Sequence, residues 1–220
     1  MRMPSPYPTF RLIPSKFPPI GLFDTVARAA DLEAVMELAG WTNDRLVSER
    51  VARLPRSEWV YGRPNASIVM AAFLHAAPSG GRFNGPDLGA WYAAADIVTS
   101  AAEVGHHLRR EAIARQVPEV RRTFRAYTAR LAGAYEDIRG SRPDVHASDD
   151  YSAGQALGET ARREGSDGFL YDSVRRHGGT NIVAYRPSKV LDVTQAQHYE
   201  ITVWSAERRI EIHELPLESA

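Results

Sequence analysis

The chain has 220 residues, 44% of them hydrophobic, and its 27 basic side chains are balanced by 27 acidic ones. This length suits one globular domain, and the zero formal charge argues against a general nucleic-acid binder, which needs a basic excess on one face. Lys16 and Lys189 are the only lysines, so 25 of the basic residues are arginines. Most of these should be solvated surface residues, but a guanidinium fork also suits bidentate binding of phosphate or carboxylate.

The chain contains no cysteine, which excludes disulfide frameworks, thiolate zinc sites and cysteine nucleophiles. No apolar segment approaches the ~20 residues that span a bilayer, and the N-terminus is rich in proline rather than apolar. We therefore expect a cytoplasmic protein with no membrane contact. The proline-rich residues 1–20 predict an N-terminal arm, followed by a single domain over residues 21–220.

Helical patterns dominate the first part of the chain. A capped helix is predicted at 32–39, and a second should run from residue 43 or 44 to about residue 54. The apolar residues 66–75 fit either a buried helix or a strand, and their content of Ala and Met favours the helix. A turn and a short strand at 90–94 follow.

The longest helix is predicted at 97–115, with Asp96 as its N-cap. Apolar residues at three- and four-residue spacing mark its buried stripe: Ile97, Ala101, Val104 and Leu108. Glu103 falls on the flank of this stripe, so its carboxylate should stand at the border between core and solvent.

The last part of the chain predicts helices mixed with antiparallel strands. Residues 119–138 fit either a helix or a hairpin, and residues 149–164 predict a helix. Strand-like runs then form two antiparallel pairs: 169–174 with 181–185, and 201–204 with 210–215. Strands separated by lone helices, without strict alternation, indicate an α+β fold with a mixed or mostly antiparallel sheet.

Motifs for metals and phosphate loops are absent from the sequence. His106 and His107 are neighbours, and adjacent helical residues point about 100° apart, so the two rings do not converge on one ion. The glycine pairs at 80–81 and 178–179 lack the spacing of a phosphate-binding loop and fit ordinary turns. We expect no metal site.

Three polar residues are spaced so that they can meet at one end of a sheet. Arg82 follows a double-glycine turn, Tyr92 lies on the short predicted strand, and Glu103 lies on the flank of the long helix. Taken singly, they have ordinary structural explanations, as a solvated turn residue, a core aromatic and a helical partner of His107. Taken together, they form a candidate site.

A series of motifs surrounds these three residues: Phe10-Arg11-Leu12-Ile13-Pro14, Met70-Ala71-Ala72-Phe73, Gly81-Arg82-Phe83-Asn84, Trp91-Tyr92-Ala93-Ala94, Gln155-Ala156-Leu157-Gly158 and Ser166-Asp167-Gly168-Phe169-Leu170-Tyr171-Asp172-Ser173-Val174-Arg175. In this order and spacing they resemble the RES domain, the toxin module of RES–Xre toxin–antitoxin pairs. The resemblance covers most of the chain and is strongest over residues 66–187.

The resemblance implies an ADP-ribosyltransferase-like fold that binds NAD as substrate and cleaves its nicotinamide glycosidic bond, by hydrolysis or by phosphorolysis with phosphate as co-substrate. Arg82, Tyr92 and Glu103 would be catalytic, and Ser173 and Arg11 would bind NAD. A carboxylate such as Glu103 suits a transition state in which the ribose becomes oxocarbenium-like. Arg82 would hold the pyrophosphate, and Tyr92 would offer its ring to the nicotinamide or its hydroxyl to the ribose.

One departure from the family pattern is Asp172, which stands where many relatives of this type have proline and adds a negative charge beside the expected site. The resemblance also implies an Xre-type helix-turn-helix antitoxin as partner, and it leaves a homodimer open. Two other functions remain open at this point. One is ADP-ribosyl transfer to a protein, and the other is an inactive module that only binds a partner.

Overall fold

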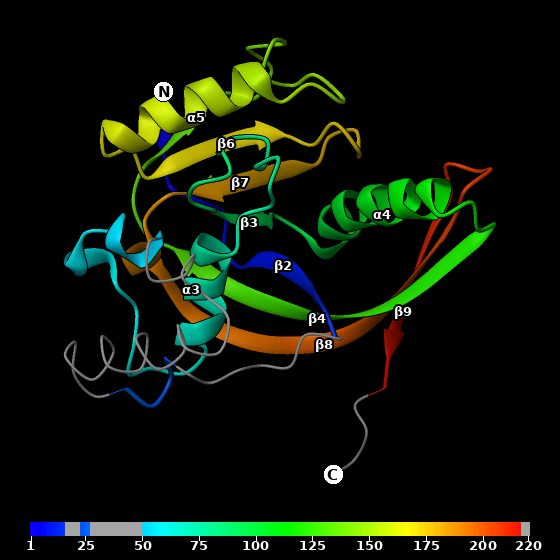
Figure 1. Cartoon of the computed structure of the whole chain (residues 1–220), viewed down its shortest axis with the longest axis horizontal. Coiled ribbons are helices and arrows are strands. Elements are labelled where there is room, and N and C mark those ends of the chain that lie inside the picture. Colours follow the sequence, from blue (N-terminus) through cyan, green and yellow to red (C-terminus); the bar gives the residue numbers. More distant parts are fainter. Residues whose placement is uncertain (16–22, 27–49, 217–220) are drawn as a thin grey trace.

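The fold is built on one large sheet of nine strands in the order β1-β5-β6-β7-β3-β2-β4-β8-β9 (Figure 1). The computed structural model describes residues 1–15, 23–26 and 50–216. Its strands are β1 (Arg2–Met3), β2 (Thr9–Pro14), β3 (Trp91–Ala94), β4 (Glu119–Leu131), β5 (Tyr135–Asp137), β6 (Gly168–Asp172), β7 (Thr180–Ala184), β8 (Val190–Trp204) and β9 (Ile210–Leu215). Neighbouring strands run antiparallel, except that β5 and β6 are parallel.

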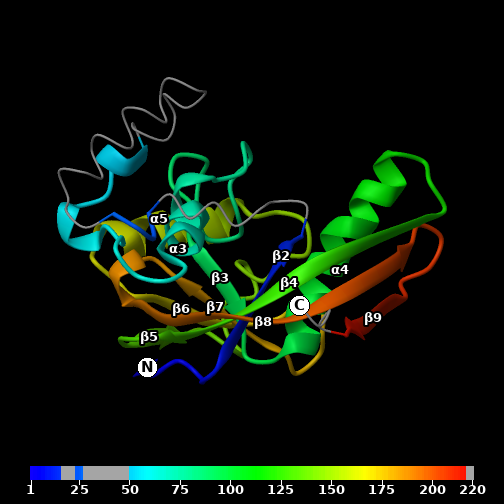
Figure 2. The ribbon, with the colours of Figure 1, turned by 90° about the horizontal axis from the view of Figure 1, so that it is seen from below.

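Three α-helices and two short 3₁₀ helices lie wholly within the described residues: α3 (Ala66–Leu74), α4 (Ile97–Ala114), α5 (Ser152–Arg163), η1 (Arg56–Glu58) and η2 (Pro187–Lys189). Residues 50–52 are helical as well. β4 and β8 are the longest strands and extend past the central strands, with β9 and α4 at the same end of the molecule (Figure 2). The expected α+β fold with a mixed, mostly antiparallel sheet is confirmed.

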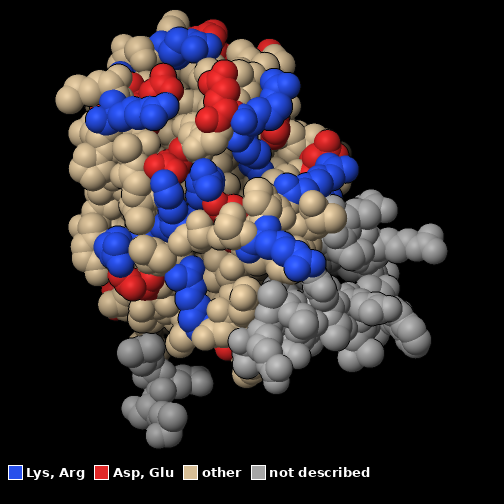
Figure 3. Space-filling view, turned by 90° about the vertical axis from the view of Figure 1, so that its left-hand side faces the viewer, with Lys and Arg blue, Asp and Glu red and all other residues tan. Residues whose placement is uncertain are grey.

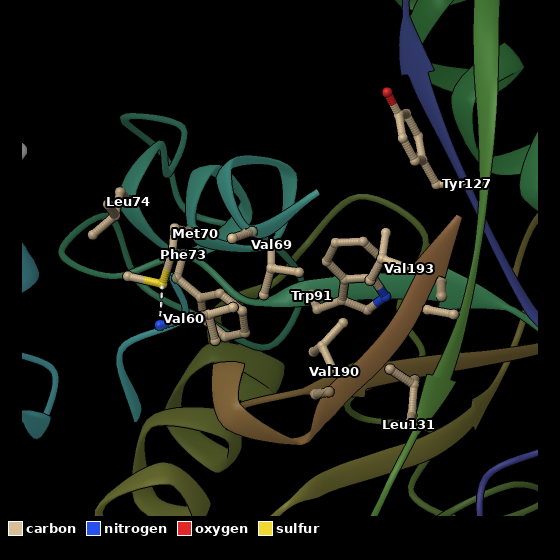
Figure 4. Packing of buried hydrophobic residues seen from close by; sticks show 14 of the residues in the cluster. Val60, Val69, Met70, Phe73, Leu74, Trp91, Tyr127, Leu131, Val190 and Val193 are labelled. Atoms are coloured by element: carbon tan, nitrogen blue, oxygen red, sulfur yellow. Dashed lines mark hydrogen bonds between the residues drawn. The ribbon is translucent and has the colours of Figure 1, made fainter. Parts of the chain in front are cut away.

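Side chains alternate between the two faces of the sheet, and β3 shows the division clearly. Trp91 and Ala93 point into the cluster that α3 covers, where Val69, Val190 and Val193 surround the Trp91 indole (Figure 4). Burying an aromatic side chain of this size contributes about 2–3 kcal/mol. The other face therefore carries the side chain of Tyr92, and it is this face that holds the candidate site.

Two helices share the opposite face of the sheet. α4 packs over β2, β4 and β8, where its apolar stripe meets Leu12, Phe124 and Ile201. α5 packs over β6 and β7, where it meets Phe169 and Val183. The central strands β7 and β3 lie between the two helices (Figure 1). A site built on these central strands can therefore draw side chains from both helices.

Most of the predicted elements are confirmed. The apolar residues 66–75 form α3, the predicted cap Asp96 accepts a hydrogen bond from the Thr99 amide at 2.8 Å, and residues 149–164 contain α5. Both antiparallel pairs near the C-terminus are present as β6 with β7 and β8 with β9. The predicted helix at 32–39 lies outside the described residues, as does the start of the helix expected to end near residue 54.

Two expectations need correction. The proline-rich arm is wrong for residues 9–14, because these form β2 in the middle of the sheet between β3 and β4, with Phe10 opposite Ala94 and Leu12 opposite Ala126. The helix or hairpin at 119–138 is wrong as well. The strand structure is interrupted at Gly133, whose φ of +111° suits glycine. The strands on either side then pair with different partners, β4 with β2 and β8, and β5 with β1 and β6.

A buried ion pair attaches the η1 segment to the end of β7. The Glu58 side chain is only 4% exposed and faces the Arg186 guanidinium, whose Nε donates to Oε1 at 2.6 Å. Ser188 donates to Oε2 from its hydroxyl at 2.6 Å and from its amide at 3.2 Å.

The surface charges are mixed on the face that Figure 3 shows, where basic and acidic side chains are interspersed.

We expect Glu58→Gln to lower the free energy of unfolding by about 2–3 kcal/mol, because it removes the charge that compensates Arg186 in a partly dry environment. Urea titration measures the change. Asp87→Asn is the control, since Asp87 pairs with Arg53 while 76% exposed, and its loss should cost less than about 1 kcal/mol. Equal losses in the two variants would contradict a special role for Glu58.

Candidate functional site

A carboxylate held by two side chains of the sheet forms the centre of the candidate site. Glu103 lies on the face of α4 that turns toward β7, and its Oε1 accepts the Ser173 hydroxyl proton at 2.7 Å and an Asn181 amide proton at 2.6 Å. Ser173 is 8% exposed and Asn181 is 2% exposed. Oε2 of Glu103 makes no hydrogen bond to any described residue. One oxygen of the carboxylate is therefore fixed while the other remains available.

The sheet register explains why these groups meet. Asn181 on β7 lies between Ala94 of β3 and Tyr171 of β6 in one row across the sheet. The small Ala94 side chain leaves room above the row for α4 and Glu103. Ser173 directly follows β6, so it continues the same side-chain alternation as Tyr171.

The turn after β6 orients the Ser173 hydroxyl. Its Oγ accepts the amide protons of Arg175 at 3.2 Å and Arg176 at 3.0 Å. Because these two donors occupy the oxygen lone pairs, the hydroxyl proton is directed to Glu103. The same turn is fastened to the start of α4, where Arg176 Nη1 donates to both Asp96 oxygens at 2.9 Å and to Thr99 Oγ1 at 2.7 Å.

Arg82 reaches the site from the turn before β3. Its side chain is buried, with Nη1 donating to the carbonyl oxygens of Val145 at 3.0 Å and Ala147 at 2.7 Å. The guanidinium carbon also lies 4.6 Å from the centroid of the Tyr151 ring, a cation–π distance. Arg82 therefore holds the segment between β5 and α5 in place.

Tyr92 uses its hydroxyl to fix the turn that carries Arg82. The hydroxyl donates to Asn84 Oδ1 at 2.7 Å and accepts the Phe83 amide proton at 2.9 Å. Gly81 is needed at this turn, because a Cβ there would lie 2.8 Å from the Tyr92 hydroxyl oxygen. Burial raises the pKa of Tyr92 above its usual value, so the group is a neutral phenol. Because the hydroxyl already makes two hydrogen bonds within the protein, the ring is the part of Tyr92 that can contact a ligand.

The structure does not bring Arg11 to the same face as Glu103. Arg11 pairs with Tyr127 across β2 and β4, and its guanidinium lies 5.0 Å from the centroid of the Trp91 ring on the α3 side of the sheet. Its Nη1 donates to the backbone oxygen of Tyr92 at 2.9 Å, and burial lowers the pKa of Arg11 to about 10. Arg11 thus supports β3 from behind.

Asp172 points away from the site. It alternates with Tyr171 on β6, and its Oδ2 accepts the Gly140 amide proton at 2.6 Å, with the charge of Arg139 nearby. The extra negative charge that this residue brings is therefore directed to the opposite face from Glu103 and Asn181.

Positive groups gather along the same flank of α4 as Glu103. Burial lowers the pKa of His107, and Arg175, Arg110 and Arg82 lower it further, while the Glu103 charge raises it. The neighbouring His106 has its pKa lowered to about 4, first by burial and then by Arg175. Within the described ranges no group of three or more His, Cys, Asp or Glu side chains could hold a metal ion. The arrangement is therefore suited to an anionic organic ligand beside one carboxylate.

Of the residues expected from the sequence, Glu103 and Ser173 are in direct contact, and Arg82 and Tyr92 meet through the turn at 81–84. The sequence interpretation did not include Asn181. The one indication of it is that asparagine is unfavourable in a strand, yet it stands beside the apolar run Ile182-Val183-Ala184. A buried polar residue in such a run needs a partner, which here is Glu103.

The sheet and the cluster together define an α+β protein with a polar site around one carboxylate between two helices. The chain belongs to the RES domain family, whose model matches residues 49–204. It is 27% identical over 202 residues to an uncharacterized protein, y4oC, of Sinorhizobium fredii, with 90% of this chain and 84% of the relative covered. A similar solved structure is that of the M. tuberculosis MbcT–MbcA toxin–antitoxin complex, with a TM-score of 0.46 and 17% identity over 93% of this chain and 88% of the other. None of the described helices is long and apolar enough to cross a membrane.

We expect Tyr92→Phe to lower the free energy of unfolding by about 1–2 kcal/mol, because Asn84 and the Phe83 amide each lose a buried partner. Chemical denaturation of the purified variant gives the value. Tyr7→Phe is the control, since Tyr7 is 69% exposed, and it should leave stability unchanged. A Tyr92→Phe variant as stable as wild type would show that the hydroxyl does not fix the turn.

The pH dependence of stability should report His106. Its pKa is about 4 in the folded protein against an ordinary value of 6.5, so the unfolded chain binds more protons between these values and stability falls as the pH drops through this window. His106→Gln should lose less stability between about pH 7 and about pH 5 than wild type does, with the exposed His177→Gln as control. An unchanged slope in His106→Gln would exclude His106 as the source, leaving the lowered pKa of His107 to account for it.

Proposed function

We propose that this protein is the toxin of a toxin–antitoxin pair and that it cleaves the bond between nicotinamide and ribose in NAD. Membership of the RES domain family supports this proposal, as does the resemblance of the motifs around Arg82, Tyr92 and Glu103 to an ADP-ribosyltransferase-like enzyme. The observation that carries it is the Glu103 carboxylate, fixed at one oxygen by Ser173 and Asn181 and available at the other.

The chemistry needs one well-placed carboxylate. As the bond between ribose C1′ and the nicotinamide nitrogen breaks, its electron pair moves onto the positively charged pyridinium ring, which leaves as neutral nicotinamide. Positive charge then develops on the ribose, and a fixed carboxylate facing it stabilises the transition state. Because the leaving group carries away no negative charge, no strong acid is required. Glu103 can also accept a hydrogen bond from a ribose hydroxyl through Oε2.

The other residues take supporting roles in this proposal. Ser173 and Asn181 hold the carboxylate, and the Tyr92 ring borders the nicotinamide. Arg82 binds the diphosphate with the donors that the loop carbonyls leave open, since its Nη1 already holds Val145 and Ala147. Arg11, on the other face, acts through the backbone of β3 and does not touch NAD.

The acceptor that attacks C1′ is water in hydrolysis, which yields ADP-ribose and a proton, or phosphate in phosphorolysis, which yields ADP-ribose 1-phosphate. We propose that the protein acts in the cytoplasm, where the NAD pool lies, and that an Xre-type helix-turn-helix antitoxin restrains it. No metal or other cofactor is part of this proposal.

Purified protein should release nicotinamide from NAD, and Glu103→Gln should release it about 10²–10³-fold more slowly, because the substitution removes the charge that faces the oxocarbenium-like ribose. Chromatographic measurement of nicotinamide, with and without phosphate, gives both the rate and the acceptor. Glu111→Gln is the matched control, since Glu111 lies on the same helix but pairs with Arg122 and Arg115.

Three outcomes separate the alternatives. Nicotinamide release that is unaffected by Glu103→Gln contradicts the mechanism. Label transferred from NAD to a protein instead of to free ADP-ribose or its 1-phosphate identifies a protein ADP-ribosyltransferase. If the protein releases no nicotinamide and about 1 mM NAD does not raise its melting temperature, the remaining alternative is a module that only binds a partner.

A further inference from the structure

Two arginines from distant parts of the sequence bind the same short segment, residues 145–148. Arg82 donates to the carbonyl oxygens of Val145 and Ala147. Arg175, in the turn after β6, donates from Nη1 to the Ser148 hydroxyl oxygen at 2.9 Å and from Nη2 to the Ser148 carbonyl oxygen. Two guanidinium groups therefore converge on neighbouring acceptors of one loop.

The segment is attached to the body of the protein at one end and exposed at the other. The Val145 side chain is 1% exposed and packs in the cluster beneath α5. Ser148 and Asp149 are exposed. The Ser148 end is thus held largely by Arg175, and it can move while Val145 stays buried.

Residues 145–148 offer the two guanidinium groups uncharged oxygen acceptors, which bind a cation less strongly than charged oxygens do. Arg82 and Arg175 bind neutral carbonyl and hydroxyl oxygens in these contacts, while Arg110 adds to the positive potential on the flank of α4 that carries Glu103. A phosphate oxygen accepts a hydrogen bond from guanidinium more strongly than a carbonyl oxygen, and it can do so in a bidentate manner. A diphosphate can therefore compete with Ser148 for Arg175, while Arg82 binds it with the donors that Val145 and Ala147 leave open.

We propose that Arg175 is the second diphosphate-binding residue of the site and that Ser148 is a latch that occupies it until the dinucleotide binds. This inference rests on the proposed function and adds to it a binding role for Arg175 and a regulating role for Ser148. Binding exchanges the Ser148 contacts of Arg175 for phosphate oxygens, and the end of the segment at Ser148 and Asp149 is released.

The latch predicts opposite effects from its two partners. Arg175→Ala removes the binding group and raises the Kd for ADP-ribose about 10- to 100-fold. Ser148→Ala removes the hydroxyl, one of the two Ser148 acceptors that compete for this guanidinium, and lowers that Kd about 2- to 10-fold. A merely structural contact would give the same direction in both variants, because either change would loosen the loop.

Calorimetric titration with ADP-ribose measures both Kd values, and Arg175→Lys, which keeps the charge but not the fork, should fall between wild type and Arg175→Ala. Arg163→Ala is the charge control, since the hydrogen bonds of Arg163 to described residues stay within its own helix, to the Glu159 carbonyl oxygen and the Thr160 hydroxyl. In wild type, ADP-ribose should also speed amide hydrogen exchange at residues 147–149.

The results distinguish this inference from the proposed function. If wild type releases nicotinamide and binds ADP-ribose, but Arg175→Ala binds it as tightly, the latch is wrong and the function stands. Weaker binding by Ser148→Ala, or slower exchange at 147–149, overturns the latch as well, because the segment would then close on the ligand. If wild type neither binds ADP-ribose nor releases nicotinamide, both proposals fall.

Discussion

The contact of Glu103 with Ser173 and Asn181 is the interaction on which the candidate site depends. A carboxylate near the core must be hydrogen-bonded, because burying a charge without partners costs several kcal/mol. Here the partners come from the β6–β7 hairpin and the carboxylate comes from α4, so satisfying one charge also fixes the position of a helix over the sheet. The ion pair of Arg176 with Asp96 makes a second connection between the same two elements. The contacts that fix the geometry of the site are therefore the same contacts that fix α4 over the sheet.

Several of the described arginines donate to backbone carbonyls and so connect distant parts of the chain. Arg82, Arg109 and Arg175 each bind two or more acceptors from loops distant in the sequence. A guanidinium can do this because its donors lie in one rigid plane, whereas an ammonium group is a point charge. A chain with zero net charge thus fixes its loops with cations and still places positive charge beside one carboxylate.

Local patterns predicted the elements that local chemistry determines. The cap at Asp96 and the apolar stripe of α4 were sufficient to place Glu103 correctly on the helix flank. The position of β2 could not be predicted in this way, because proline content describes the composition of a segment and not its partners, and the partners Ala94 and Ala126 lie far along the chain. The role of Asn181 could not be predicted for the same reason, since it depends on the Glu103 carboxylate, which only the fold brings near it. The roles of Arg82 and Tyr92 could not be predicted either, because the sequence does not reveal which of their atoms already make hydrogen bonds within the protein.

The central position of β2 has a consequence for synthesis of the protein. β2 leaves the ribosome before β3 and β4, yet it needs these two strands on its two sides, and β3 needs β7. Long-range pairing of this kind forms late in folding. A nascent chain that has already exposed Arg82, Tyr92 and Glu103 still lacks Ser173 and Asn181, so its carboxylate has nothing to hold it. The complete site therefore forms only after β6 and β7 have been translated, because Ser173 and Asn181 come from these strands and the turn between them.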